Sequence, residues 1–193
     1  MKKNIYNFLL IILILAAIIV GIMIFNKYYK EIKNEEQLYE VVTNIENDKK
    51  ETEKKHTYKG YDVIGIIEIP KIKIKYPILS KTTEESMLVS VTKFWGPNVN
   101  EIGNITIAGH NNFSGTMFGK TKQLEKNDII KLTDLKNNTK EYKVFDKYSI
   151  DPNDVSCVES VEEGTREVTL LTCTKGHKER LIIKAREDIK NKK

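Results

Sequence analysis

An uncharged apolar run near the N-terminus constrains this chain more than any other feature. Residues Phe8–Phe25 carry no charge, and Gly21 is the only interruption of their apolar sequence. At about 1.5 Å of rise per residue, roughly 20 such residues cross the ~30 Å hydrocarbon core of a bilayer. We therefore expect residues 1–26 to form a transmembrane anchor.

A cleaved signal peptide is the alternative interpretation of this run. Its apolar region would be about 7–15 residues long and would end in a small-x-small cleavage site. Lys27–Tyr29 follow the run and offer no such site, whereas tyrosines are common at membrane interfaces. The pattern thus favours an uncleaved signal anchor. Lysines flank the run on both sides, so their distribution does not decide its orientation.

Residues 27–60 predict a polar stalk between the anchor and a globular domain. The first part is free of proline and rich in Glu and Lys, with apolar residues at helical spacing. These apolar residues are Leu38, Val41, Val42 and Ile45. The stripe is lost in Asn47–Lys59, where we expect a flexible tether.

Residues 61–193 show the pattern of an all-β domain. Short runs of β-branched and apolar residues are separated by Pro, Gly and Asn. The expected strands are Val63–Ile69, Ile72–Ile74, Tyr76–Leu79, Asn104–Ala108, Asp128–Thr133, Lys140–Ile150, Glu167–Thr172 and Arg180–Arg186. Short helices or turns are expected at Thr82–Ser90 and Asp151–Ser160. Eight short strands predict a closed eight-stranded β-barrel, large enough to fold unaided.

The charge distribution excludes one class of function. The net charge is +5, from 32 Lys and Arg against 27 Asp and Glu, and the two signs are mixed along the chain. Binding to a nucleic-acid backbone needs clustered basic residues. We therefore expect no nucleic-acid partner.

The cysteine count excludes a disulfide-rich scaffold, because Cys157 and Cys173 are the only two. With His110 and His177 they lack metal-ligand spacing, so we expect neither a metal nor a cofactor. Either the two thiols form a disulfide or at least one of them is reactive. Cys157 fits a buried structural cysteine.

Three residues at the ends of expected strands carry the candidate chemistry. Cys173 follows an apolar strand and precedes a polar loop, which would place its thiol at a groove. His110 ends another strand after Gly109, which lets the backbone turn without a Cβ clash. Arg180 opens the next strand, and a hairpin would return its guanidinium toward Cys173, where it can donate to an oxyanion. The alternatives are a structural cysteine, a surface turn histidine, and a surface arginine paired with Glu179 or Glu187.

Together these residues resemble the sortases of bacterial cell surfaces. Thr169–Cys173 matches the family's Thr-Leu-x-Thr-Cys signature, Arg180 stands where the family's arginine follows on the next strand, and His110 matches its strand-end histidine. The segment Ile64–Ile72 also resembles the family's first strands. The likeness covers about residues 62–186.

The resemblance implies a sortase barrel and a cysteine transpeptidase that cleaves an LPxTG-like sorting signal between Thr and Gly. Cys173 would form a thioacyl-enzyme, His110 would protonate the leaving amine, and Arg180 would hold the substrate and the oxyanion. The partners would be secreted proteins that carry the signal and an amine of a peptidoglycan precursor or a pilin. The resemblance further implies a single-pass membrane protein with a cytoplasmic N-terminus and an extracellular catalytic domain.

Several details resemble class D sortases in particular. They are the short chain, the N-terminal anchor, the absence of an apolar C-terminal segment, and the local sequences Gly109–Asn112 and Gly115–Gly119. The calcium site of some sortases is not carried over, because its acidic ligands have no match here.

Other readings stay open on the sequence alone. His177 is an alternative acid or base, although its loop favours a solvated side chain. A membrane-tethered binding module would hold a peptide in the barrel groove without chemistry. A hydrolytic cysteine protease would release its product without an amine acceptor.

Overall fold

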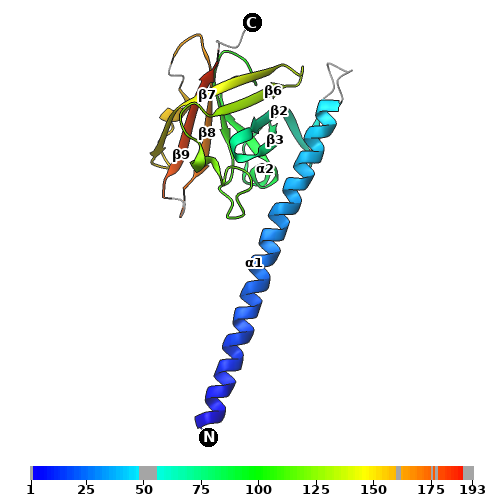
Figure 1. Cartoon of the computed structure of the whole chain (residues 1–193), viewed down its shortest axis with the longest axis vertical. Helices are drawn as coiled ribbons and strands as arrows, with labels where there is room; N and C mark the ends of the chain where they lie inside the picture. The colour runs from blue at the N-terminus through cyan, green and yellow to red at the C-terminus, as the bar shows by residue number, and fades with distance from the viewer. Residues whose placement is uncertain (1, 48–55, 160–161, 175, 177, 189–193) are drawn as a thin grey trace.

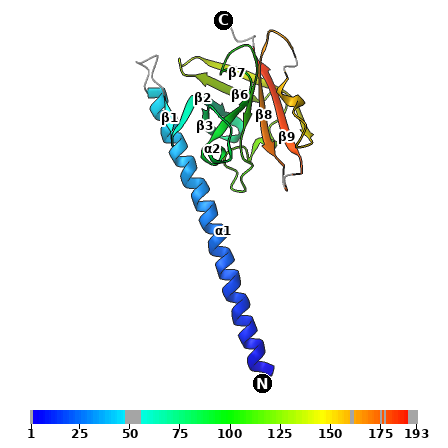
Figure 2. The same ribbon diagram turned by 180° about the vertical axis from the view of Figure 1, so that it is seen from behind.

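The computed structural model describes residues 2–47, 56–159, 162–174, 176 and 178–188. It consists of one long helix and a β-barrel that packs beside the C-terminal part of that helix (Figure 1 and Figure 2). The helix, α1, spans Lys2–Asn47 without a break, and its N-terminal half extends away from the barrel. Residues predicted as anchor and as stalk are thus parts of one helix.

Strands dominate the rest of the chain, as predicted. The strands are β1 (Thr57–Tyr58), β2 (Tyr61–Ile69), β3 (Ile74–Leu79), β4 (Val91–Trp95), β5 (Gly103–Ala108), β6 (Ile129–Asp134), β7 (Thr139–Ile150), β8 (Arg166–Cys173) and β9 (Arg180–Glu187). The short helices bounded within the described residues are α2 (Glu84–Val89) and the 3-10 helices η1 (Pro70–Ile72), η2 (Thr121–Gln123) and η3 (Ser156–Val158). A capping box between Thr83 and Ser86 starts α2. Of the short helix or turn expected within Thr82–Ser90, the structure has the helix.

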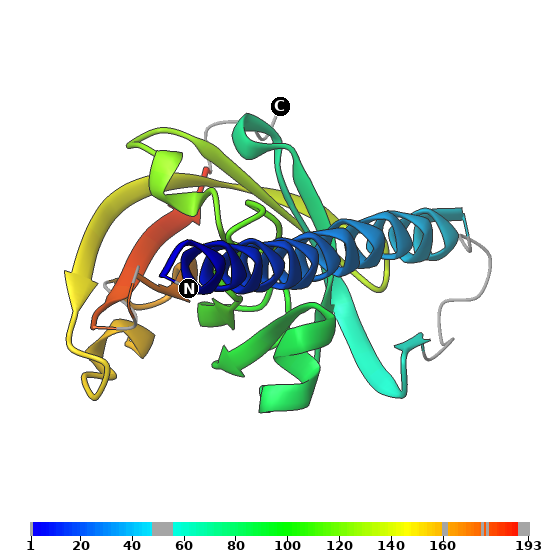
Figure 3. The same cartoon turned by 90° about the horizontal axis from the view of Figure 1, so that it is seen from below.

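The eight longer strands close into a barrel, which confirms the predicted fold class. Their order is β2-β3-β4-β5-β8-β9-β7-β6, and β6 pairs back onto β2. The β3–β4 and β5–β8 pairs are parallel and the others are antiparallel. The two-residue strand β1 adds to the edge of β2. Figure 3 views this barrel from the side of the α1 N-terminus.

The predicted strand Ile72–Ile74 is wrong. Pro70 begins the 3-10 helix η1 instead, and Lys73 ends it with a left-handed backbone (φ 55°), so β3 begins only at Ile74. Ile72 and Ile74 are nevertheless buried, while Lys73 is exposed. The alternation of isoleucine and lysine predicted which side chains are buried but not the backbone conformation between them.

The barrel contains one strand, β4, that the sequence analysis did not predict. It pairs with β3 on one side and β5 on the other. Val91 and Thr92 are both buried, so the strand lacks the alternation by which a half-buried strand is recognised. The predicted number of eight barrel strands was right, although β4 takes the place of the predicted strand Ile72–Ile74.

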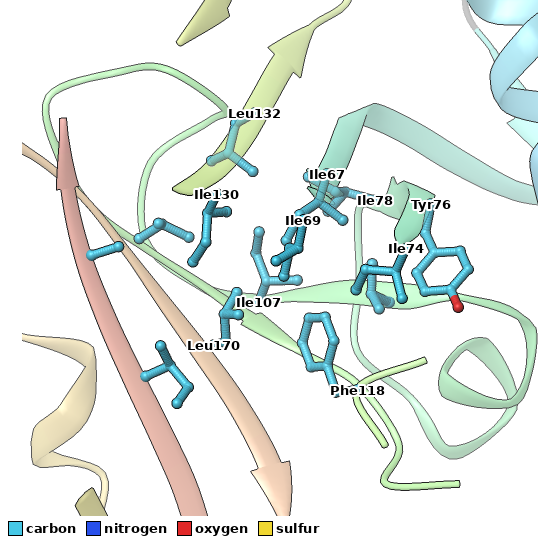
Figure 4. Packing of buried hydrophobic residues seen from close by; sticks show 14 of the residues in the cluster. Ile67, Ile69, Ile74, Tyr76, Ile78, Ile107, Phe118, Ile130, Leu132 and Leu170 are labelled. Atoms are coloured by element: carbon cyan, nitrogen blue, oxygen red, sulfur yellow. The ribbon is translucent and has the colours of Figure 1, made fainter. Parts of the chain in front are cut away.

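Isoleucine, leucine and aromatic side chains fill the interior of the barrel. Figure 4 shows Ile67, Ile69, Ile74, Tyr76, Ile78, Ile107, Phe118, Ile130, Leu132 and Leu170 packed in this core. Successive strand residues face opposite sides of a sheet. Since Leu170 points inward, Leu171 and Cys173 lie on the outer face of β8.

A second apolar cluster covers this outer face. It contains Ala108, Cys157, Leu171 and Ile182, under the connection between β7 and β8 that carries η3. Asn104 donates from Nδ2 to the carbonyl oxygens of Cys157 and Val158, at 3.1 Å and 3.0 Å. Within Asp151–Ser160, where a short helix or turn was expected, Pro152 and Asn153 form a turn and η3 begins at Ser156.

Buried polar side chains hold this connection in place. The ammonium group of Lys184, itself 4% exposed, donates to the carbonyl oxygen of Glu159 at 2.7 Å. Thr169 donates to Oδ1 of Asn104 at 2.9 Å, which orients the amide toward η3. Because buried polar groups are costly without partners, these hydrogen bonds fix the connection against the barrel.

The C-terminal part of α1 packs directly on the barrel. Leu38, Val42 and Ile45 are buried there, and Tyr39 donates from its hydroxyl to the carbonyl oxygen of Lys73 at 2.8 Å. At the end of the segment predicted as a tether, β1 pairs with β2. Residues 48–55 lie outside the described part of the chain.

Candidate active site

The parallel pairing of β5 and β8 brings His110 and Cys173 to one edge of the sheet. Ala108 is the register partner of Leu171. Two positions after each of them, β5 leads to His110 and β8 ends at Cys173. The Gly109 N–H donates to the carbonyl oxygen of Leu171 at 3.1 Å. In return, the Thr172 hydroxyl donates to the carbonyl oxygen of Gly109 at 2.7 Å. The threonine before the cysteine therefore fixes the residue before the histidine.

Gly109 is required by close packing. A Cβ atom at this position would lie 2.7 Å from the ring of Phe118 and 3.0 Å from Val91. Any larger residue would therefore push His110 away from β8 or displace Phe118 from the core.

Arg180 lies directly opposite Cys173 in the antiparallel pair β8–β9. The Thr174 N–H donates to the carbonyl oxygen of Glu179 at 2.9 Å and extends the pairing beyond the strand ends. Directly opposed residues have Cβ atoms about 4.5–5.5 Å apart, which lets the guanidinium reach groups bound at the thiol. Glu187, one of the proposed alternative partners of Arg180, pairs instead with Lys140 and Arg166.

A cleft of about 260 Å³ opens at this edge of the barrel. His110 and Cys173 both line it, together with Asn111, Phe113 and other residues of the two loops. Arg180 is not part of the lining and stands next to Cys173 on β9. The structure thus brings the three predicted residues together, two in the cleft and one at its side.

Asn111 is a member of this site that the sequence analysis did not single out. Its side-chain amide donates to the carbonyl oxygen of Cys173 at 2.8 Å and so ties the two loops together. An amide side chain directly after the histidine was the available signal, but its partner lies 62 positions away in the sequence.

The two cysteines differ in their surroundings. Both are free thiols, so the alternative of a Cys157–Cys173 disulfide is wrong. Cys157 is buried, and this burial raises the pKa of its thiol. Cys173 is half-buried at the cleft. His177, the alternative acid or base, lies outside the described residues.

The loop that follows His110 is a compact hairpin. Asn111 bridges to Met117, and the Phe118 N–H donates to the carbonyl oxygen of His110 at 2.9 Å. Met117 has a left-handed backbone with φ 52°, which costs a non-glycine residue about 1–2 kcal/mol. Surrounding contacts must therefore stabilise the loop in this conformation.

Those contacts come from Tyr76 of β3 and, behind it, from the helix α1. The Tyr76 hydroxyl accepts a hydrogen bond from the Met117 N–H at 3.1 Å and donates to Glu35 at 2.7 Å. Burial, together with this contact to Glu35, raises the pKa of Tyr76 far above its ordinary value, so the hydroxyl keeps its proton. Ser114 donates to Glu31, one helical turn before Glu35. The histidine loop is thus fastened to α1 at two points.

Comparison with known proteins identifies the family to which this geometry belongs. Residues 67–188 match the model of the Sortase domain. The chain belongs to the sortase family. Sortases are cysteine transpeptidases, and the closed barrel with a cysteine at the end of a strand agrees with that activity.

Individual relatives extend the likeness over most of the chain. Sortase A of Bacillus anthracis is 29% identical over 189 residues, which cover 89% of this chain and 88% of that protein. The structure of the Sortase D5 transpeptidase of Clostridium perfringens has a TM-score of 0.63 and 28% identity, covering 81% of this chain and 97% of the other. Listeria monocytogenes sortase A has a TM-score of 0.60 and 28% identity, covering 65% of this chain and 87% of the other.

The predicted resemblance to class D sortases is supported by two of the relatives. One is the Clostridium perfringens structure. The other is Sortase D of Bacillus subtilis, which is 30% identical over 112 residues, or 56% of this chain and 53% of that protein.

The contact between α1 and the histidine loop predicts an effect on turnover. Replacing Tyr76 by Phe removes the acceptor of the buried Met117 N–H and the donor to Glu35. We expect kcat for transpeptidation to fall by roughly tenfold, the effect of about 1.4 kcal/mol on the barrier, with a smaller change in KM. Steady-state kinetics of the full chain measure both constants.

Tyr39→Phe is the matched control for this variant. It also removes a tyrosine hydroxyl that joins α1 to the barrel, but its partner is the carbonyl oxygen of Lys73, outside the loop. An equal loss of kcat in the two variants would contradict a specific role of Tyr76 in holding the loop.

Proposed function

We propose that this sortase is a membrane-anchored enzyme that cleaves an LPxTG-like sorting signal between Thr and Gly and joins the protein to an amine. In this proposal Cys173 is the nucleophile, His110 the general acid and Arg180 the donor to the oxyanion. The observation that carries it is the register of β5 and β8, since it delivers His110 and Cys173 to one cleft. Arg180 stands opposite the cysteine on β9.

The first half of the reaction forms a thioester. The Cys173 thiolate attacks the carbonyl carbon of the Thr in the signal, and the negative charge moves to the carbonyl oxygen. The Arg180 guanidinium donates hydrogen bonds to that oxygen while the tetrahedral centre exists. His110 gives its proton to the Gly nitrogen as the C–N bond breaks, because an amine leaves poorly unless it is protonated. The Gly-containing fragment departs and the acyl group stays on Cys173.

The second half of the reaction returns the enzyme to its starting state. An amine of a peptidoglycan precursor or a pilin attacks the thioester carbonyl and gives up a proton to His110. The new amide bond forms as the C–S bond breaks, and Cys173 leaves as a thiolate. Exclusion of water from the cleft favours the amine over hydrolysis, since a thioester reacts faster with an amine than with water.

The outer face of the sheet offers a surface for the apolar part of the signal. Beside Leu171, partly buried Met87 and Phe94 extend the outer cluster from α2 and β4. An extended peptide that reaches Cys173 along this face can pack its Leu and Pro side chains against them. Such contacts remove apolar area from water, at about 25 cal/mol for each Å².

The membrane part of the proposal rests on α1. This helix is long and apolar enough to be a candidate span, and its apolar side chains between Phe8 and Phe25 are exposed. Exposed apolar side chains on all sides of a helix are stable in lipid rather than in water. We place the N-terminus in the cytoplasm and the barrel outside the cell, where signal-bearing proteins and amine acceptors are available.

A covalent intermediate is the decisive test of the proposed chemistry. When the full chain is incubated with an LPxTG-type peptide, mass spectrometry is expected to detect an acyl adduct on Cys173 and none on Cys157. The buried Cys157, with its raised pKa, has little thiolate to react. Adding an amine should discharge the adduct into a transpeptidation product.

Two results would contradict this expectation. Free peptide acid as the main product, despite saturating amine, would identify a hydrolase. Tight peptide binding without an adduct, unchanged in Cys173→Ala, would show that the thiol takes no part.

The proposed acid can be tested by comparing two histidines. His110→Ala is expected to lower kcat by about 10²–10⁴-fold, the usual contribution of a general acid or base. His177→Ala is the matched control and should retain near-normal kcat. If the change at His177 is the more damaging one in steady-state assays, the assignment of His110 is wrong.

The proposed topology predicts which part of the protein a protease can reach. Protease added to intact cells should remove the barrel and leave a membrane-bound fragment of α1, as detected by immunoblotting with tags at the two ends. Recovery of a mature chain that begins after Phe25 would instead identify a cleaved signal peptide. Protection of the barrel from the protease would indicate the opposite orientation, with the barrel in the cytoplasm.

A further inference from the structure

The loop that carries the site histidine exposes a large aromatic ring at its tip. Phe113 lies in the turn closed by the hydrogen bond from the Gly115 N–H to the carbonyl oxygen of Asn112, at 3.0 Å. It is 91% exposed, more than any other large apolar side chain that the structure describes. An exposed apolar side chain marks an interaction site when further apolar side chains gather around it.

The neighbours of Phe113 lie at the end of the apolar run of α1. Phe113 borders one cavity with Gly21, Ile24, Phe25 and Tyr28. These helix residues recur three and four positions apart and therefore form a single stripe along α1. The stripe begins within the uncharged run and ends at the first tyrosine after it. Phe113 thus stands at the level where α1 would leave the hydrocarbon of a bilayer.

The height of the loop along α1 is fixed by hydrogen bonds. Ser114, the residue after Phe113, donates to Glu31, and the amide of Asn34 donates to the carbonyl oxygen of Val89 at 3.0 Å. Figure 1 shows the loop, in light green, at the end of the barrel that faces the N-terminus of α1. Since α1 continues without a break, the loop cannot move away from this level without losing these contacts.

A second apolar side chain lies at the same end of the barrel. Leu88 of α2 is 70% exposed and borders a cavity of about 800 Å³ together with Met23 and His110. Lys27 and Lys30 line the same cavity, and the carboxylate of Glu31, which also lines it, accepts the hydrogen bond from Ser114. Apolar side chains flanked by lysines are the pattern by which protein surfaces rest on anionic bilayers.

We propose that Phe113 and Leu88 insert into the interface of the bilayer that α1 spans, with Lys27 and Lys30 against anionic headgroups. The mouth of the cleft containing His110 and Cys173 then lies at the membrane surface. This inference rests on the proposed membrane anchoring of α1, and it adds a second contact between the enzyme and the lipid.

Fluorescence quenching by brominated lipids tests the contact. Trp95, the only tryptophan, is replaced by Phe, and single tryptophans are placed in the full chain as Phe113→Trp or Leu88→Trp. The proteins are reconstituted into phosphatidylcholine and phosphatidylglycerol vesicles with or without bromine on the acyl chains. Ile14→Trp, within the apolar run, reports insertion of α1. Ile102→Trp is the exposed control, because it precedes β5 and lies at the opposite end of that strand from His110.

The proposal predicts that Phe113→Trp and Leu88→Trp lose emission in brominated vesicles and shift to shorter wavelength. Their loss should lie between that of Ile14→Trp and the unchanged emission of Ile102→Trp. Quenching of Ile14→Trp alone would overturn the loop contact while leaving the anchor intact. No quenching of Ile14→Trp would overturn the anchor and the loop contact together. Equal quenching of Ile102→Trp and Phe113→Trp would indicate adsorption without a defined orientation and would also overturn the proposal.

Discussion

The site depends on the parallel pairing of β5 with β8. Parallel strands end at the same edge of a sheet, so the residues after Ala108 and Leu171 leave the barrel side by side. A shift of β8 by one residue would exchange its inner and outer faces and turn Cys173 into the core. The hydrogen bonds from Gly109 to Leu171 and from Thr172 to Gly109 oppose such a shift. The arrangement of the cleft therefore depends on backbone register before it depends on any side chain.

Periodicity predicted most of the barrel because its strands bury one face more than the other. The run around Ile72 shows where that reasoning fails, since buried isoleucines alternate with lysines although Pro70–Ile72 form a 3-10 helix. In contrast, β4 is a strand without alternation, held by its neighbours on both sides. The spacing of apolar residues predicts which side chains are buried, but it does not predict which distant strands pair.

The site shows the same division between local and distant information. Cys173 and Arg180 lie close in the sequence, so a hairpin was enough to predict that they face each other. His110 was recognised from a motif, and its place beside Cys173 follows only from the pairing of two distant strands. Tyr76 has the pattern of an ordinary core residue, and nothing in the sequence indicates that its hydroxyl connects α1 to the histidine loop.

The distance along the chain between the two halves of the site has a consequence for folding. Asn111 and Cys173 are joined across 62 positions, so this contact closes a long loop. Contacts of this kind form slowly, because closing a long loop loses conformational entropy before the contact stabilises the chain. During synthesis, β5 emerges well before its partner β8, and β9 emerges last of the strands. Cys173 therefore comes to lie beside His110 and Asn111 only when nearly the whole barrel has been made.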